Sequence, residues 1–220
     1  LSAGAAITTG SRNIAIGGVA LDNVDSENDN LAIGYAALGG AIDGGELNVA
    51  IGNYSLDALT TGDRNTAIGY NALTANTTGY YNTATGANVL KANTTGYLNV
   101  AMGESSLDAN TTGNQNVAIG TYSLTSNTTA GANTAIGTYA SYYNTTGNRN
   151  VGVGFQSLWY NTTGDKNVGI GYQSLYGADG SSSNDNTALG YKTGYAITSG
   201  TDNVAVGSEA LAANTTGGDN

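Results

Sequence analysis

The chain has 220 residues and a formal net charge of −10, and it contains 34 glycines but no proline, cysteine or histidine. Without imidazole or thiolate groups it cannot build a Ser-His-Asp triad, a zinc site or a disulfide, so we expect no enzyme, no metal and no cofactor. Six basic residues against 16 acidic ones disfavour a nucleic-acid partner, and the lack of an apolar run of about 20 residues disfavours membrane insertion.

An asparagine recurs along the whole chain with a period of 17 residues. The twelve units that it opens begin at Asn13, Asn30, Asn48, Asn65, Asn82, Asn99, Asn116, Asn133, Asn150, Asn167, Asn186 and Asn203. Two steps are longer, and their additional residues fall in segments 39–46 and 177–185, whose Gly and Ser content is typical of surface loops. We expect one continuous array over residues 1–220. Because neither end carries a distinct capping unit, we also expect a longer chain or contact between copies.

Each unit reads as a short strand, a bend, a second short strand and a polar turn. With the phasing Asn as position zero, position two is Ala or Gly, position three is apolar in all but one unit, and position four is always Gly. Position eight is Leu in ten of the twelve units. Strand residues alternate between faces, so we expect positions three and eight to stack as two internal ladders. Asp at Ile68 or Ile119 should therefore destabilise the fold severely.

The remaining columns predict close approaches between coils. Small residues at position two indicate that an opposite wall or a neighbouring chain comes near. The invariant glycine at position four indicates a positive φ or a tight backbone approach. The phasing Asn side chains are expected to form an amide ladder along the stack.

These columns predict an all-β solenoid, or β-roll, of about twelve 17-residue coils with two short strands per coil. Helical repeats are disfavoured, because such units have about 34 residues and because each Gly inside a helix costs roughly 1 kcal/mol. One strand spacing of about 4.8 Å per coil would give an elongated rod.

The pattern N-x-A-I-G, a small-residue bend and a second short strand resembles the YadA-like head repeats of trimeric autotransporter adhesins. The longer form NTAIGYNALTANTTG at 65–79 is also similar to repeats of phage tail-fibre and bacterial surface proteins. The resemblance extends from Asn13 to Asn220, although the adhesin-head repeat is shorter. It implies a parallel homotrimer on a cell or virion surface.

Seven N-x-S/T sequons share one turn column and are candidates for glycan attachment. They lie at Asn76, Asn93, Asn110, Asn127, Asn144, Asn161 and Asn214, and an eighth sequon lies at Asn53. Attached glycans would form a row along the rod. The favoured interpretation is structural, because Asn begins turns through hydrogen bonds from its side chain to the backbone.

Aromatic residues lie mostly at bends and turns, where they can stack on a sugar or on another protein. The candidates for ligand stacking are Tyr80, Tyr81, Tyr97, Tyr142, Tyr143, Trp159 and Tyr160. Again a structural role is favoured, either between chains or over the edge of the roll.

Acidic residues gather at Asp22, Asp25, Glu27 and Asp29, and again at Asp179 and Asp185. Their spacing matches neither an EF-hand nor a calcium-binding glycine-rich repeat, so a solvated turn is favoured over a cation site. The Thr pairs do not favour ice binding, because they lie in a turn.

The leading hypothesis is a structural segment of an extracellular, cell-surface or virion-surface fibre or adhesin. The first alternative is the subunit of a self-assembling extracellular filament, and the second is a carbohydrate-binding module that uses the aromatic rows. A glycan-degrading enzyme ranks last. The expected partners are copies of the same chain, as a trimer or an end-to-end filament, and a host-surface glycan or protein.

Overall fold

The computed structural model describes residues 2–5, 7–23 and 26–220. Contacts divide the chain into two compact units, Leu1–Thr112 and Gly113–Asn220. In the first unit the strands are β1 (Ile14–Ile16), β2 (Leu31–Ile33), β3 (Val49–Ile51), β4 (Thr66–Ile68), β5 (Thr83–Thr85) and β6 (Val100–Met102). In the second they are β7 (Val117–Ile119), β8 (Thr134–Ile136), β9 (Val151–Val153), β10 (Val168–Ile170), β11 (Thr187–Leu189) and β12 (Val204–Val206). The described residues contain no helix that could cross a membrane.

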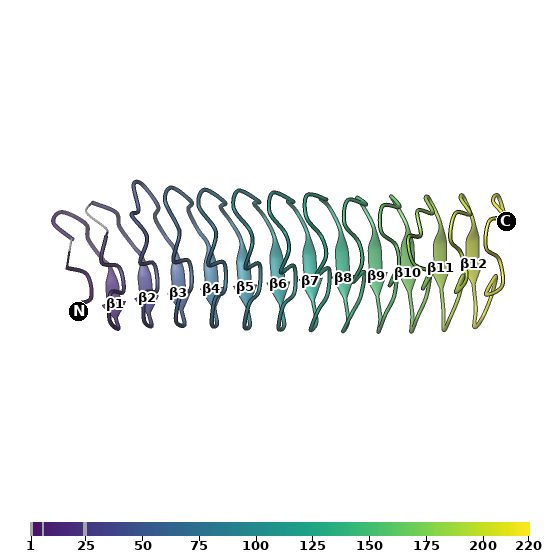
Figure 1. The fold of residues 1–220 in the computed structure, drawn as a ribbon, viewed down its shortest axis with the longest axis horizontal. Helices are drawn as coiled ribbons and strands as arrows, with labels where there is room; N and C mark the ends of the chain where they lie inside the picture. The colour runs from purple at the N-terminus through teal and green to yellow at the C-terminus, as the bar shows by residue number, and fades with distance from the viewer. Residues whose placement is uncertain (1, 6, 24–25) are drawn as a thin grey trace. The chain divides into compact units, whose positions relative to one another are not determined.

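Within each unit, successive strands pair in parallel and in register, one repeat apart (Figure 1). In the first unit Ala67 of β4 lies opposite Ala50 of β3 and Ala84 of β5. In the second, Ala135 of β8 lies opposite Ala118 and Gly152. A sheet whose neighbouring strands are separated by one 17-residue repeat is a β-solenoid, which confirms the predicted fold class.

Each coil contains one strand, and the second predicted strand is wrong. The residues six and eight positions after the phasing Asn have left-handed backbone angles, as Tyr139 (φ 61°) and Ser141 (φ 51°) illustrate. Each such residue costs about 1 kcal/mol relative to ordinary backbone. Hydrogen bonds between coils hold this segment instead of a strand ladder: the N–H of Tyr139 donates to Thr121 O at 3.0 Å, and that of Leu124 donates to Ala140 O at 3.0 Å.

The interior is lined by the small column at position two and by the Leu column at position eight. Ala67 and Leu73 are both fully buried in the first unit, as are Ala118 and Leu124 in the second. The Leu prediction is confirmed, whereas the inward assignment of position three is wrong: Ile68 is 38% exposed and Ile119 is 36% exposed. A three-residue strand directs its middle residue to one face and its outer two to the other. This narrow interior accepts the small middle residue.

The invariant glycine has both properties that its column predicted. Its φ lies in the left-handed region, for example +130° at Gly137 and +131° at Gly52. A Cβ built on Gly137 would lie 2.7 Å from the carbonyl oxygen of Gly154 in the next coil. Only a residue without a side chain fits there.

The phasing asparagines form the predicted amide ladder in both units. In the first, Asn82 donates its backbone N–H to Asn65 Oδ1 at 3.0 Å. It also donates Nδ2 to Gly96 O at 2.8 Å. In the second, Asn150 donates its backbone N–H to Asn133 Oδ1 at 2.9 Å. The side chain of this column thus connects adjacent coils and closes its own coil.

We expect Asn82→Ala to lower the free energy of unfolding by about 2 kcal/mol, because it leaves buried partners without hydrogen bonds. Asn82 is fully buried, and its Oδ1 accepts the backbone N–H of Asn99. Chemical denaturation measures the change. Thr95→Ala, at an exposed turn position of the same 17-residue repeat, is the control and should change stability by less than about 0.5 kcal/mol. Equal losses would show that the ladder contributes nothing beyond an ordinary side chain.

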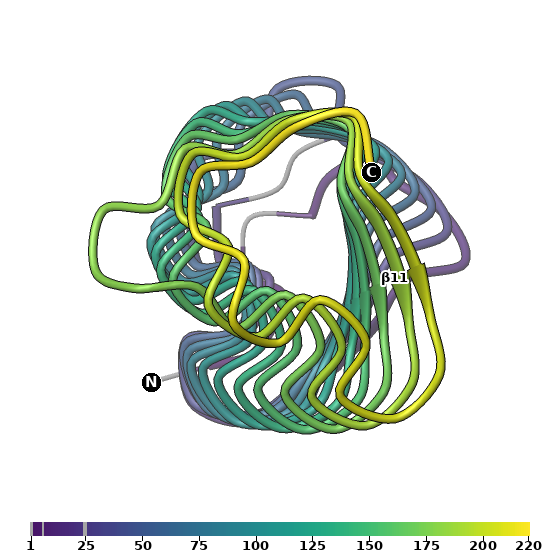
Figure 2. The ribbon, with the colours of Figure 1, turned by 90° about the vertical axis from the view of Figure 1, so that its right-hand side faces the viewer.

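The two longer repeats place their additional residues at the surface, as predicted. Ala178, Asp179 and Gly180 are exposed, and this green loop projects from the side of the coil opposite the strands (Figure 2). In segment 39–46, Ala41 is exposed, whereas the side chain of Ile42 is buried.

Candidate functional site

The outward residues of the strands form an apolar surface on each unit, which we call the outer strand face. In the first unit its residues are Ile14, Ile16, Leu31, Ile33, Val49, Ile51, Thr66, Ile68, Thr83, Thr85, Val100 and Met102. In the second they are Val117, Ile119, Thr134, Ile136, Val151, Val153, Val168, Ile170, Thr187, Leu189, Val204 and Val206. None of these residues is charged, and the exposed fraction reaches 67% at Val206. A large exposed apolar surface of this kind is typical of an interaction site.

The sequon asparagines are core residues of the coil. Asn93 is fully buried and donates Nδ2 to Asn76 Oδ1 at 2.8 Å and to Gly96 O at 3.0 Å. Asn144 makes the same pair of bonds in the second unit. Other coils fill this turn column with an apolar side chain instead, and Ile42, Leu59 and Ile197 there are also buried.

Burial and hydrogen bonding support the structural interpretation of the sequons. A glycan would be attached to the Nδ2 atom that these bonds occupy, so the folded coil has no room for it at the six buried positions of the column. These positions are Asn76, Asn93, Asn110, Asn127, Asn144 and Asn161. Asn214 is half-buried and donates Nδ2 to Gly217 O at 3.0 Å. Asn53, outside the column, is exposed.

The seven candidate aromatic residues do not form one cluster. In the first unit, Tyr80 stacks on Tyr97 with ring centroids 4.9 Å apart and meets Tyr81 edge-on. Tyr142, Tyr143, Trp159 and Tyr160 belong to the second unit and lie at a different phase of the repeat. The first group precedes the phasing Asn, whereas the second group follows position eight.

In the second unit a continuous ladder of rings crosses four coils. We call Tyr142, Trp159, Tyr176 and Tyr195 the aromatic ladder. Successive ring centroids lie 4.9, 6.3 and 4.9 Å apart, with interplanar angles of 16° or less. Tyr176 and Tyr195 were not among the candidates, although their positions, nine residues after Asn167 and Asn186, are the same as that of Trp159 after Asn150.

A second stack lies at another phase of the same unit, where Phe155, Tyr172 and Tyr191 follow one another with centroids 5.5 Å apart. In both stacks successive rings lie nearly parallel, so each ring partly covers the face of the next ring. A sugar stacks on an exposed ring face, so the interior of these ladders offers mainly ring edges. The arrangement supports the structural role of the aromatic residues over a sugar-stacking platform.

Burial raises the pKa of Tyr176 above its ordinary value, and the neighbouring Tyr160 and Tyr195 raise it further. The unfolded chain therefore loses this proton at lower pH than the folded chain does. We expect stability to fall as the pH rises above the ordinary tyrosine pKa of about 10 and through the folded value. Unfolding free energies measured across this range should fall less steeply for Tyr176→Phe than for the unmodified chain. The same pH dependence in both chains would show that folding does not raise the pKa of Tyr176.

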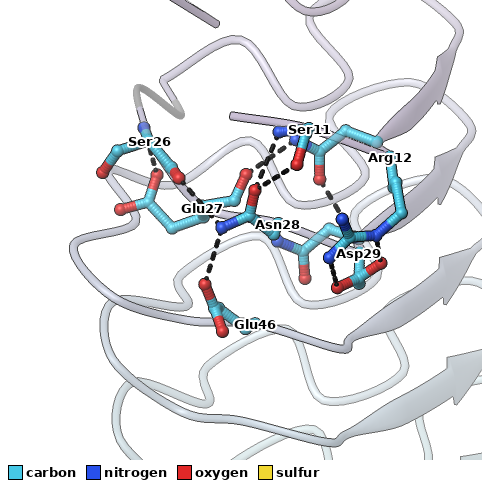
Figure 3. A network of polar contacts seen from close by, with 9 residues as sticks. Ser11, Arg12, Ser26, Glu27, Asn28, Asp29 and Glu46 are labelled. Carbon is cyan, nitrogen blue, oxygen red and sulfur yellow. Dashed lines mark hydrogen bonds and ion pairs between the residues drawn. The ribbon is translucent and has the colours of Figure 1, made fainter. Parts of the chain in front are cut away.

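Two carboxylates of the first acidic stretch, Glu27 and Asp29, are bound to other groups of the protein (Figure 3), whereas one buried oxygen of Asp22 has no hydrogen-bond partner. Asp29 forms an ion pair with Arg12 at 2.5 Å, and the guanidinium lowers the pKa of its carboxyl group. Glu27 is buried and accepts the backbone N–H groups of Ser26 and Gly44, each at 3.0 Å. Asp25 lies outside the described residues. The expectation of a solvated turn is therefore wrong for Glu27, although its protein donors favour a structural turn over a cation site.

Asn28 connects the coils beside this ion pair. Its Oδ1 accepts the N–H and the hydroxyl of Ser11 at 2.9 and 2.7 Å, and its Nδ2 donates to Glu46 Oε1 at 2.9 Å. The carboxylates of Glu27 and Asp29 have protein donors, so the local geometry favours coil-to-coil linkage over cation binding.

The second unit contains a surface hollow of about 400 Å³, which we call the polar hollow. It is lined by Asn114, Gln115, Gly131, Ala132, Asn148, Arg149 and Asp165. The sequence-based candidates did not include it. The sequence nevertheless distinguishes this repeat, because Gly131 and Ala132 carry no side chain larger than Cβ. Every other repeat has at least one larger side chain in the two residues before the phasing Asn.

Comparisons of the chain with protein-family models, with curated proteins and with solved structures give no match. The resemblance to adhesin heads and tail fibres therefore stays a hypothesis.

Proposed function

We propose that the chain is a structural segment of an extracellular fibre or adhesin, in which copies of the solenoid associate through their outer strand faces. The exposed, uncharged apolar surface on every coil carries this proposal. Burial of such a surface between copies is favourable by roughly 25 cal/mol per Å² of apolar area removed from water. No catalytic activity is part of the proposal.

A second copy of the same chain is the occupant that fits the outer strand face best. The face repeats with the period of the coils, so only a partner with the same strand spacing can match it along a whole unit. Parallel copies around a common axis form a closed ring through heterologous contacts, in which the outer strand face of each copy meets both of its neighbours. The resemblance to adhesin heads favours three copies, on a cell or virion surface.

The alternative of a carbohydrate-binding module that uses the aromatic rows is weaker, because each stacked ring partly covers the next. An end-to-end filament is the remaining structural alternative. The mass of the assembly distinguishes the two arrangements: a closed ring has a fixed stoichiometry, whereas a filament grows with concentration.

The double variant Ile119→Asp/Ile136→Asp tests the proposal on the full chain. Charges on the outer strand face should dissociate the assembly, because they would be buried without partners between copies. Circular dichroism should still report the folded solenoid, since both side chains point away from the interior. Sedimentation velocity measures the mass.

Thr129→Asp/Thr146→Asp is the matched control, because it adds two charges at exposed turn positions of the same two repeats. This variant should keep the mass of the unmodified assembly. The proposal is wrong if the outer-face variant retains the assembly, or if both variants dissociate to the same extent.

A further inference from the structure

The polar hollow exists because one repeat lacks the side chains that fill this column elsewhere. Gly131 and Ala132 occupy the two positions that hold Asn148 and Arg149 in the next repeat. A Cβ on Gly131 would lie 2.9 Å from Asn114 O, so even an alanine would press against the wall. The hollow falls within the range of roughly 300–1,000 Å³ that is typical of small-molecule sites.

Coil-to-coil hydrogen bonds position the walls of the hollow. Asn148 Oδ1 accepts the N–H of Gly131 at 2.9 Å, and Asn148 Nδ2 donates to Thr146 O at 2.8 Å. The Asn148 N–H in turn donates to Asp165 Oδ1 at 2.6 Å. One carboxylate oxygen of Asp165 is therefore held by the backbone, which fixes the direction of the other.

Arg149 is the cationic group of the hollow. The ion pairs found in the described parts of the chain are Arg12 with Asp29 and Lys166 with Asp185, so Arg149 has no carboxylate partner within 4.0 Å there. Among the cations that form no ion pair in the described parts, Arg149 is the one that lines the hollow. Its planar fork of donors matches a carboxylate in a bidentate arrangement.

We propose that the polar hollow binds a carboxylated sugar unit of a glycan. The Arg149 guanidinium donates hydrogen bonds to the sugar carboxylate, and the Asp165 carboxylate accepts hydrogen bonds from sugar hydroxyls. The amides of Asn114 and Gln115 form hydrogen bonds with the remaining hydroxyls. A mixture of one cation, one carboxylate and several amides suits a ligand that is polar on all sides. A peptide carboxylate would bring apolar groups, for which the walls offer only the methyl group of Ala132.

The lining of the hollow shares no residue with the outer strand face or with the aromatic residues, so the proposal does not rest on self-association. It lies on the turn before the phasing Asn, whereas the outer strand face begins after that Asn. Loss of ligand binding and loss of assembly can therefore be measured separately.

Ligand-observed NMR with the full chain tests the proposal, with methyl glucuronide as the probe and methyl glucoside and acetate as comparisons. Methyl glucuronide should bind at least about tenfold more tightly than either comparison, because only it satisfies the guanidinium and the hydroxyl partners together. Arg149→Gln should weaken binding of methyl glucuronide by about tenfold or more.

Two further variants make the result specific to the hollow. Ala132→Leu fills it without new backbone strain, since Leu47 and Leu98 occupy the same column with φ near the 59° of Ala132. This variant should abolish binding and remain folded. Arg64→Gln removes an arginine from the same column in the first unit and should leave binding unchanged. Equal affinity for acetate or methyl glucoside, binding that survives Arg149→Gln, or no binding of methyl glucuronide would each overturn the proposal.

Discussion

Ala67→Asp is expected to prevent stable folding of the first unit, with a loss of about 4 kcal/mol or more in the free energy of unfolding. Ala67 is fully buried, and its neighbours in register, Ala50 and Ala84, are also fully buried alanines. A carboxylate at this position would lie in the narrow interior without a hydrogen-bond donor or a cation. It would also be too large for the space that the column leaves.

Ile68→Asp, one residue later, is the matched control. Ile68 points outward and is 38% exposed, so the charge remains in water and the cost in an isolated chain should be about 1 kcal/mol. Chemical denaturation should be followed at concentrations low enough that the midpoint no longer depends on concentration, because this removes any effect of association. If Ile68→Asp costs as much as Ala67→Asp, position three does not point outward.

Gly137→Ala is expected to destabilise the second unit by about 3 kcal/mol or more, through two additive causes. The backbone at Gly137 has a φ of +130°, which residues with a Cβ rarely adopt. The new Cβ would also lie 2.7 Å from Gly154 O, which belongs to the backbone of the next coil and cannot move aside. Thermal and chemical unfolding measure the loss.

Gly180→Ala separates the two causes. Gly180 has a φ of +80°, but a Cβ there would meet no atom within 4 Å. The control should therefore cost only the backbone strain, about 1 kcal/mol. If the two variants lose the same stability, the close approach between coils at the glycine column does not restrict the fold.

The sequence predicted those columns whose side-chain type has one physical interpretation. An invariant Gly such as Gly137 indicates a positive φ or a close approach, and both are found. A Leu column such as that of Leu73 indicates the core, and an Asn column such as that of Asn82 indicates an amide ladder. Each of these predictions required only the repeat phase.

Alternation alone could not predict which residues of the strand face the interior. Alternation separates Ala67 from Ile68, but it does not say which of them lies inside. General hydrophobicity favoured Ile68, whereas the small diameter of the coil admits only Ala67. The second strand was wrong for a different reason. Its left-handed residues, such as Tyr139 and Leu124, are not glycines, so no residue type revealed the backbone angle.

The candidate sites depend on which residues occupy the same position in neighbouring repeats. A consensus of the repeats does not show such differences between one repeat and the next. The aromatic ladder adds Tyr176 and Tyr195 to two of the sequence-based candidates, and it required comparison of the same position across four coils. The polar hollow depends on what Gly131 and Ala132 lack. Comparison of these two positions with the same positions in the neighbouring repeats would have identified the hollow.

Sedimentation equilibrium of the unmodified chain tests most directly whether the outer strand face joins copies of the solenoid. A parallel homotrimer predicts a single species with three times the chain mass of 22.0 kDa, unchanged over a wide range of protein concentration. A single species of 22.0 kDa at every concentration, with the chain folded, would contradict the proposed assembly.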